Sequence, residues 1–121
     1  LTANRRAFTI MVRNYMFRLV QLFALEKEDR LAELLDYLDE VPDFGAILDD
    51  YFDEYDDIDS GPEARGPEYF RLGDTDSRLW SVRQIIKDPV GDHAYQFVAT
   101  VDLDASDEAG EVRLSDLRVE Y

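Results

Sequence analysis

The sequence contains no cysteine and only one histidine, His93. The absence of cysteine excludes disulfide bonds, thiolate zinc sites and cysteine nucleophiles. Positive charge is also scarce, because 13 Lys and Arg residues stand against 28 Asp and Glu residues, which gives a formal net charge of -15. A chain this acidic repels phosphate backbones, so we expect no direct nucleic-acid binding by this chain.

Signature motifs of catalysis are missing as well. The sequence contains no GxSxG, no HExxH, no Walker lysine motif and no glycine-rich dinucleotide fingerprint. The apolar segment at residues 8–25 is interrupted by charged residues, unlike a membrane span. The acidic tract at residues 49–59 does not fit a calcium loop, because a proline stands where the turn glycine belongs. We therefore expect no catalytic residue, no cofactor, no metal and no membrane partner.

What is present supports one compact domain. Apolar residues make up 45% of the 121 residues and aromatic residues 12%, which is enough for a hydrophobic core. The sequence begins at Leu1 without an initiator methionine or a signal-peptide pattern. We interpret residues 1–121 as a single domain excised from a larger protein, and its lack of cysteine is compatible with the cytoplasm.

The first half of the sequence predicts helices. Helical spacing of apolar residues predicts one helix over residues 8–25, a second over 27–38 and a third over 44–55. Asp43 is the expected N-cap of the third helix. The first helix has a wide apolar arc, which needs a broad cover such as a sheet. Residues 60–67 then break regular structure with glycine and proline.

The second half predicts a curved antiparallel sheet. Apolar and polar residues alternate over residues 79–86, 95–103 and 112–121, separated by turns at 88–92 and 104–110. The alternation slips by one residue between Leu114 and Leu117, which predicts a bulge near Ser115 or Asp116. The fold class is therefore α+β, with the N-terminal helices packed on the sheet. This order resembles the cone of the nuclear transport factor 2-like superfold.

Two groups of residues are candidates for a function. A pocket near His93, with His93 as a general base beside Asp92, is one, although aromatic residues at such positions also serve simply as core. The first helix and its lead-in hold the only cationic concentration that the sequence shows, a candidate contact surface. The pocket set is Trp80, Asp92, His93 and Tyr95, and the contact set is Arg5, Arg6, Arg13 and Arg18.

The two faces of the predicted sheet have different expected partners. Trp80 and Phe97 occupy strand positions that should face the first helix. Leu79, Ile85 and Val98 occupy the opposite face, where they would be exposed unless a partner covers them. We therefore consider a homodimer through the sheet face.

Three segments resemble the extreme C-terminal part of actinobacterial DEAD/DEAH-box helicases, and the likeness covers about residues 5 to 115. The segments are RRAFTIMVRNYMFRLVQL, LDDYFDEYDDIDSGPEARGPEYFRL and WSVRQIIKDPVGDHAYQFVATVDLDASDEAGEVRL, of which the last is the most specific. The resemblance implies a cytoplasmic parent enzyme that couples ATP hydrolysis to RNA or DNA unwinding. The phosphate loop, the DEAD/DEAH motif and the arginine finger of such an enzyme are not in this sequence.

The expected function is therefore that of a non-catalytic accessory domain. Such a domain would mediate docking on the remainder of the parent helicase chain, self-association or partner recruitment. The alternative is a small-molecule-binding or enzymatic cone with its pocket near His93, and the sequence does not decide whether the chain is an enzyme.

Overall fold

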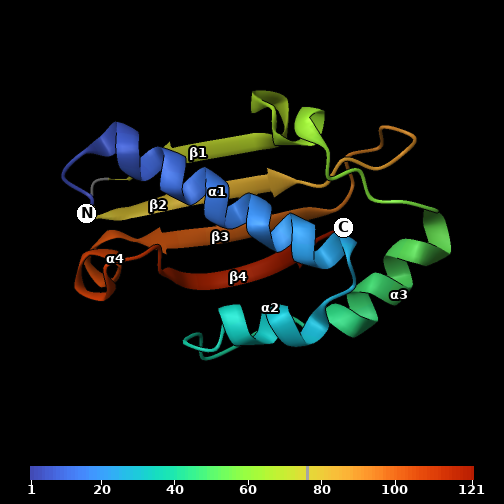
Figure 1. The fold of residues 1–121 in the computed structure, drawn as a ribbon, viewed down its shortest axis with the longest axis horizontal. Helices are drawn as coiled ribbons and strands as arrows, with labels where there is room; N and C mark the ends of the chain where they lie inside the picture. The colour runs from blue at the N-terminus through green and yellow to red at the C-terminus, as the bar shows by residue number, and fades with distance from the viewer. Residues whose placement is uncertain (76) are drawn as a thin grey trace.

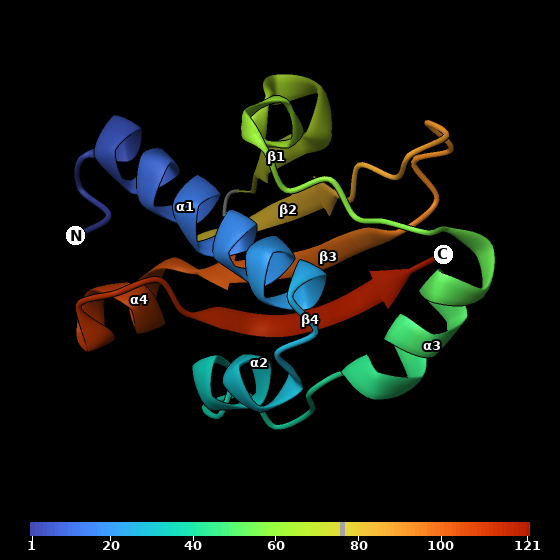
Figure 2. The ribbon, with the colours of Figure 1, turned by 45° about the vertical axis from the view of Figure 1, so that its right-hand side comes forward.

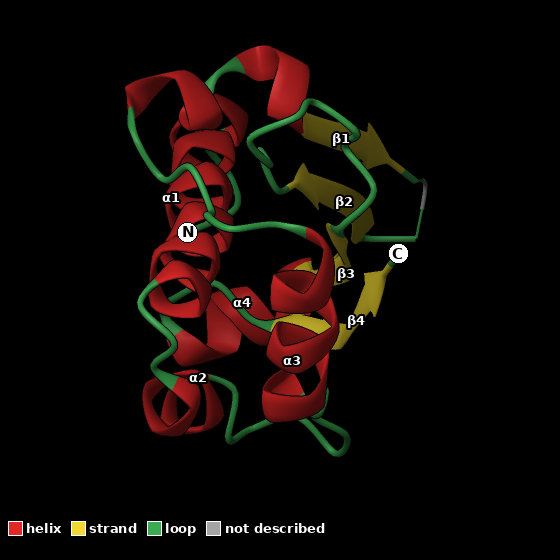
Figure 3. Ribbon diagram, turned by 90° about the vertical axis from the view of Figure 1, so that its right-hand side faces the viewer, coloured by secondary structure: helices red, strands yellow, loops and turns green. Residues whose placement is uncertain are grey.

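The structure is a computed structural model that describes residues 1–75 and 77–121. Helices lie on one side of an open, four-stranded antiparallel sheet of order β1-β2-β3-β4, and the other side of the sheet is uncovered by helices (Figure 3). The elements are α1 (Arg5–Ala24), α2 (Glu28–Leu34), α3 (Phe44–Glu54), β1 (Phe70–Asp74), β2 (Leu79–Ile85), β3 (Gln96–Asp102), α4 (Leu103–Ala109) and β4 (Leu114–Glu120), with short 3-10 helices η1 (Pro62–Arg65) and η2 (Pro67–Tyr69) before β1.

The helix α1 lies across the inner face of the sheet (Figure 1). It begins after Asn4, whose side chain accepts a hydrogen bond from the backbone N–H of Ala7. Its wide apolar arc is covered by the sheet, as predicted. Trp80 and Phe97 lie on neighbouring antiparallel strands and both face α1, which confirms that prediction. The Trp80 ring centroid lies 5.2 Å from that of Phe8, and Phe97 meets the ring of Phe23 edge-on at 5.4 Å.

The smaller helices pack at the margins of this layer. Asp43 caps α3 as predicted, because its carboxylate accepts a hydrogen bond from the backbone N–H of Ala46 at 3.1 Å. The chain ends beside α3 (Figure 2), where the Tyr121 hydroxyl donates to Asp50 at 2.6 Å. The predicted second helix is shorter than expected and ends at Leu34.

Two expectations about the second half of the chain need correction. The strand β1, which forms the edge of the sheet, was not predicted from the sequence. Residues 104–110 were predicted as a turn, but α4 occupies most of that segment. Asp102 caps α4 through the backbone N–H of Ala105, and Gly110 ends it with a φ of 74° that favours glycine.

The bulge in β4 is confirmed. Thr100 pairs with Asp116 and the next residue, Val101, pairs with Leu114, so Ser115 is the extra residue. This shift keeps both Leu114 and Leu117 on the buried face. Bulges increase local twist and bend the strand that carries them.

Candidate functional site

The buried carboxylate of Asp88 organises the loop that carries Asp92 and His93. Its Oδ1 accepts hydrogen bonds from the backbone N–H groups of Val90 at 3.1 Å and Asp92 at 2.9 Å, and its Oδ2 accepts from that of His93 at 2.8 Å. Burial alone would raise the pKa of Asp88, but these backbone donors outweigh it and hold the pKa below its usual range. The carboxylate thus also holds His93 at its unusual φ of 55°.

The polar side chains of this loop are engaged with tyrosines. The hydroxyl of Tyr55 donates a hydrogen bond to Asp92 at 2.7 Å, and this bond, together with burial, raises the pKa of Tyr55. The ring of His93 meets the ring of Tyr69 edge-on, with the centroids 5.1 Å apart. Asp92 and His93 therefore share a loop but contact different neighbours.

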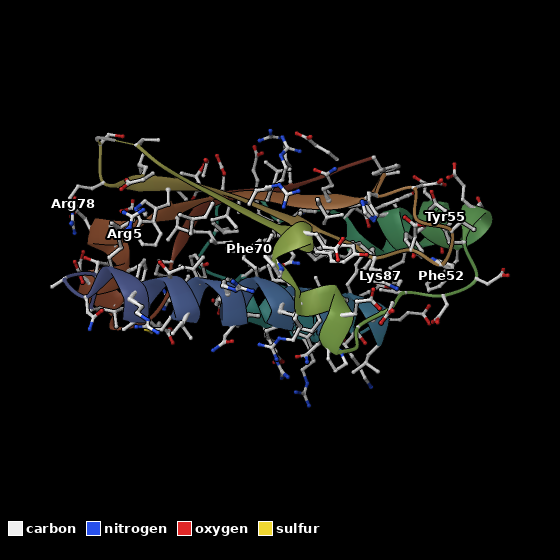
Figure 4. All side chains as sticks on the ribbon, turned by 90° about the horizontal axis from the view of Figure 1, so that it is seen from above. Arg5, Phe52, Tyr55, Phe70, Arg78 and Lys87 are labelled. Carbon is white, nitrogen blue, oxygen red and sulfur yellow. The ribbon has the colours of Figure 1, made fainter. Side chains whose placement is uncertain are left out.

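The two aromatic members of the predicted pocket lie far from each other along the sheet. Tyr95 stacks on Tyr121 with a centroid distance of 4.4 Å, and burial raises its pKa to about 12. Trp80 is buried at the opposite end of the β2–β3 pair, where it lies opposite Val101. Figure 4 shows these two ends through Tyr55, the partner of Asp92, and Arg5, the partner of Trp80. The structure thus brings Asp92, His93 and Tyr95 to one end and leaves Trp80 at the other.

The arginines of the predicted contact surface do not act as one patch. Arg5 forms an ion pair with Asp74 and lies over the Trp80 ring, with its Cζ 5.0 Å from the centroid. Arg13 instead lies over the ring of Phe70, at 5.3 Å. Arg5 thus covers the edge of the hydrophobic core, because a guanidinium group over an indole ring shields the ring from water and is attracted to it. The remaining members, Arg6 and Arg18, are exposed.

A second cationic cluster lies on the sheet face opposite the helices. The strand register places Arg71 opposite Arg83, Arg83 opposite Val98, and Val98 opposite Arg118. We call Arg71, Arg83 and Arg118 the arginine row. The expectation that the first helix holds the only cationic concentration is therefore wrong, because strand pairing gathers residues that are far apart in the sequence.

The next row of the same face is made of small residues. Gly73, Ser81 and Thr100 lie in register beside the arginine row and help to line an open trough of about 480 Å³. A Cβ atom on Gly73 would lie 2.6 Å from the Ser81 hydroxyl oxygen, so the absence of a side chain at this position leaves room for Ser81 in the trough. Of the residues expected to be exposed here, Ile85 is buried, and Leu79 and Val98 are half-buried.

One carboxylate neutralises part of the arginine row. Glu120 accepts hydrogen bonds from Arg83 at 2.8 Å and from Arg118 at 2.7 Å, and these two guanidinium groups hold its pKa below the usual range. Arg71 donates to main-chain carbonyl groups of the preceding turn and, within the described residues, forms no ion pair. Its direct cross-strand neighbour is Arg83. Like charges directly opposite each other destabilise a sheet, so this arrangement has an energetic cost.

Over residues 1–75 and 77–121, no group of three or more His, Asp or Glu side chains is placed to hold a metal ion. In the acidic tract, Asp59 pairs with Lys87 at 2.8 Å, and this contact lowers its pKa. No helix within the described part of the chain is long and apolar enough to cross a bilayer.

Comparisons with known proteins assign the family. A search of curated proteins found no match to the chain, and a search of solved structures found none either. A scan of family models matched residues 1–119 to a domain of unknown function, DUF3516. Because this match covers nearly the whole chain, the protein belongs to the DUF3516 family.

Proposed function

We propose that this chain is a non-catalytic accessory domain of an ATP-dependent RNA or DNA helicase, and that it docks through the arginine row on an acidic segment of the helicase core. The helicase part of the proposal follows from the sequence resemblance to the C-terminal part of actinobacterial DEAD/DEAH-box helicases. We propose a cytoplasmic location on the same ground, because the resemblance implies a cytoplasmic parent enzyme.

The arginine row is the observation that carries the docking proposal. A guanidinium group opposite another in a sheet costs stability, yet Arg71 and Arg83 are placed so in a chain with 28 acidic residues. An acidic partner would offset this repulsion and pair with Arg71, which has no carboxylate partner within the described residues. Charge complementarity of this kind steers association and selects partners.

The geometry favours docking over the alternative of a small-molecule or enzymatic pocket near His93. The Asp88 carboxylate accepts hydrogen bonds from three backbone N–H groups, and the Asp92 carboxylate accepts one from Tyr55. Both carboxylates therefore already have partners within the chain.

The packing of α1 bears on the finer description of the fold. A helix that fills the concave side of a bulged sheet supports a nuclear transport factor 2-like cone, and here α1 fills that space with core side chains. We propose the cone as the finer description of the fold.

The test uses this chain and the helicase core of its parent as separate purified polypeptides. The double variant Arg71→Glu with Arg118→Glu reverses two charges of the arginine row. Arg30→Glu is the matched control, because Arg30 is exposed on α2, away from the sheet face. We expect the double variant to weaken binding at least about tenfold, as loss of a close charge pair does at other interfaces, and the control to bind as the natural chain does.

Two results would contradict the proposal. The first is a core that binds the natural chain and the double variant equally well. The second is a parent gene whose upstream sequence encodes neither a phosphate loop nor a DEAD/DEAH motif. We expect circular dichroism to show a retained fold in both variants, because the substituted residues are exposed.

A further inference from the structure

A pocket lies on the helical side of the sheet, between α1, η1, β1 and β2. It encloses about 240 Å³ and is separate from the trough that holds the arginine row, because it is on the other face of the sheet. Phe70 and Gln84, which pair across β1 and β2, contribute to its wall. Figure 4 shows Phe70 between α1 and the sheet. The other lining residues are Ile10, Arg13, Asn14, Phe17 and Arg65.

Two guanidinium groups of this pocket are held in place by aromatic rings and by hydrogen bonds to neighbouring residues. Arg13 lies over Phe70 with 5.3 Å from its Cζ to the ring centroid, and Arg65 lies over Phe17 at 4.9 Å. Arg13 donates to the main-chain carbonyl of Arg65 at 3.0 Å, and Arg65 donates to the Asn14 side-chain oxygen at 2.8 Å. Stacking and hydrogen bonding fix the planes of both guanidinium groups, so less side-chain entropy is lost when a ligand binds.

Neither Arg13 nor Arg65 forms an ion pair within the described residues. The same holds for Arg6, Arg18, Arg30 and Arg71. Five other arginines of the same chain do form ion pairs, namely Arg5, Arg78, Arg83, Arg113 and Arg118. The pocket therefore presents two adjacent positive charges to solvent with no carboxylate to neutralise them.

Gln84 adds a hydrogen-bond acceptor to a pocket whose two arginines are donors. Its side chain is 2% exposed, and its amide nitrogen donates to the Tyr69 carbonyl at 3.1 Å. That bond assigns the amide orientation, and the remaining oxygen accepts no hydrogen bond from the described residues. No fully buried side-chain oxygen of the described residues lacks a partner, so this oxygen is open to the pocket that Gln84 lines. An acceptor that faces a pocket can take a donor from a ligand.

We propose that this pocket binds a small phosphate monoester. Two guanidinium charges match the charge of a phosphate monoester, which is about -1.5 to -2 at pH 7, and fixed guanidinium forks suit phosphate oxygens. The pocket volume corresponds to about eight water molecules at roughly 30 Å³ each, which leaves room beyond the phosphate group itself. A hydroxyl or N–H group of the ligand next to the phosphate donates to the free oxygen of Gln84.

The binding test uses isothermal titration calorimetry of this chain with four probes. They are glycerol 3-phosphate, inorganic phosphate, glycerate and glycerol. We expect glycerol 3-phosphate to bind with a Kd of about 1 mM or tighter, and inorganic phosphate to bind more weakly because it makes no contact beyond the phosphate group itself. Glycerate, with one negative charge, should bind at least about tenfold more weakly than glycerol 3-phosphate, and glycerol should not bind.

Variants locate the site. Arg13→Gln and Arg65→Gln keep polar side chains and should each weaken glycerol 3-phosphate binding at least about tenfold, whereas Arg30→Gln should leave it unchanged. Equal binding by Arg30→Gln and Arg65→Gln chains, or no saturable binding of glycerol 3-phosphate, would overturn the proposal. Equal affinity for glycerate would redefine the ligand as any carboxylate and also overturn it. The side-chain amide resonances of Asn14 and Gln84 in nuclear magnetic resonance spectra give a second measurement, because both should shift on binding.

Discussion

Asp88→Asn is the substitution for which the structure gives the sharpest expectation. It keeps the size of the side chain but removes the charge and replaces one acceptor oxygen with an NH₂ group. The carboxylate is 3% exposed and accepts backbone hydrogen bonds from Val90, Asp92 and His93. Hydrogen bonds to a charged group contribute about 1.5 to 3 kcal/mol each, so losing one and weakening two should cost roughly 2 to 4 kcal/mol at pH 7. That is a large part of the stability of a typical domain.

The pH dependence of this cost follows from the sign of the pKa shift. The pKa of Asp88 is lower in the folded chain than its ordinary value of about 3.9. A depressed folded pKa gives stability that is fully present above the unfolded pKa and is lost as the pH falls through the folded pKa. The difference between the natural chain and Asp88→Asn should therefore shrink below about pH 4.

Equilibrium urea unfolding, followed by circular dichroism at pH 7 and pH 3, measures both effects. Asp56→Asn is the matched control, since Asp56 is exposed and the substitution removes the same charge from a chain of net charge -15. A loss of less than about 1 kcal/mol at pH 7 would refute the role of the carboxylate, because one buried charged hydrogen bond alone exceeds that. A loss that is the same at both pH values would refute the assignment of the charged form.

Three further predictions concern the core, the oligomeric state and nucleic acid. Trp80→Ala should lower the free energy of unfolding by about 3 to 5 kcal/mol, and an unchanged urea midpoint would contradict the burial of that ring. A homodimer through the sheet face, which the sequence led us to consider, would bring the two arginine rows together, so we now expect a monomer in sedimentation at micromolar concentration; a dimer of the natural chain at that concentration would contradict this charge argument. Labelled single-stranded and duplex RNA at about 50 mM salt should show no saturable micromolar binding, since nucleic-acid binders neutralise roughly 6 to 10 phosphates. Binding that falls with Arg71→Glu would place the sheet face on the substrate path.

Much of the fold could be predicted because its signals are local. The change from helical to alternating spacing separates α1, α2 and α3 from the later strands. The slip between Leu114 and Leu117 predicted a bulge near Ser115 or Asp116, and the extra residue is Ser115. The helix α4 also had a local signal that the prediction passed over. Asp102 before the segment and Gly110 after it are a typical N-cap and C-terminal glycine.

The edge strand β1 had no such signal. It is five residues long, contains Gly73 and follows a segment rich in glycine and proline. Its strand geometry depends on pairing with β2, a tertiary contact. Without β1 the position of Arg71 beside Arg83 could not be predicted, and neither could the arginine row.

The register of the β2–β3 hairpin explains why the four residues of the predicted pocket near His93 do not lie together. A hairpin that turns at residues 88–92 brings Ile86 beside Tyr95, and the Ile86 N–H donates to the Tyr95 carbonyl at 2.9 Å. Trp80 is then six residues before Ile86 on one strand and must lie beside Val101 on the other. The rise of a strand, about 3.3 Å per residue, separates Trp80 from the Ile86–Tyr95 pair by roughly 20 Å.

The distribution of charge over the fold links the two proposals without making one depend on the other. Some acidic side chains pair with arginines near the N-terminus, where Asp104 and Asp107 pair with Arg78, and Glu120 pairs with Arg83 and Arg118 on the sheet face. The unpaired cations Arg71 and Arg13 lie instead on opposite faces of one sheet. The two sites lie on opposite faces of the same two strands. Arg71 and Phe70 are consecutive residues of β1, and Arg83 and Gln84 are consecutive residues of β2, so in each strand one member belongs to the arginine row and the other lines the pocket. Coupling between the two sites would therefore pass through β1 and β2.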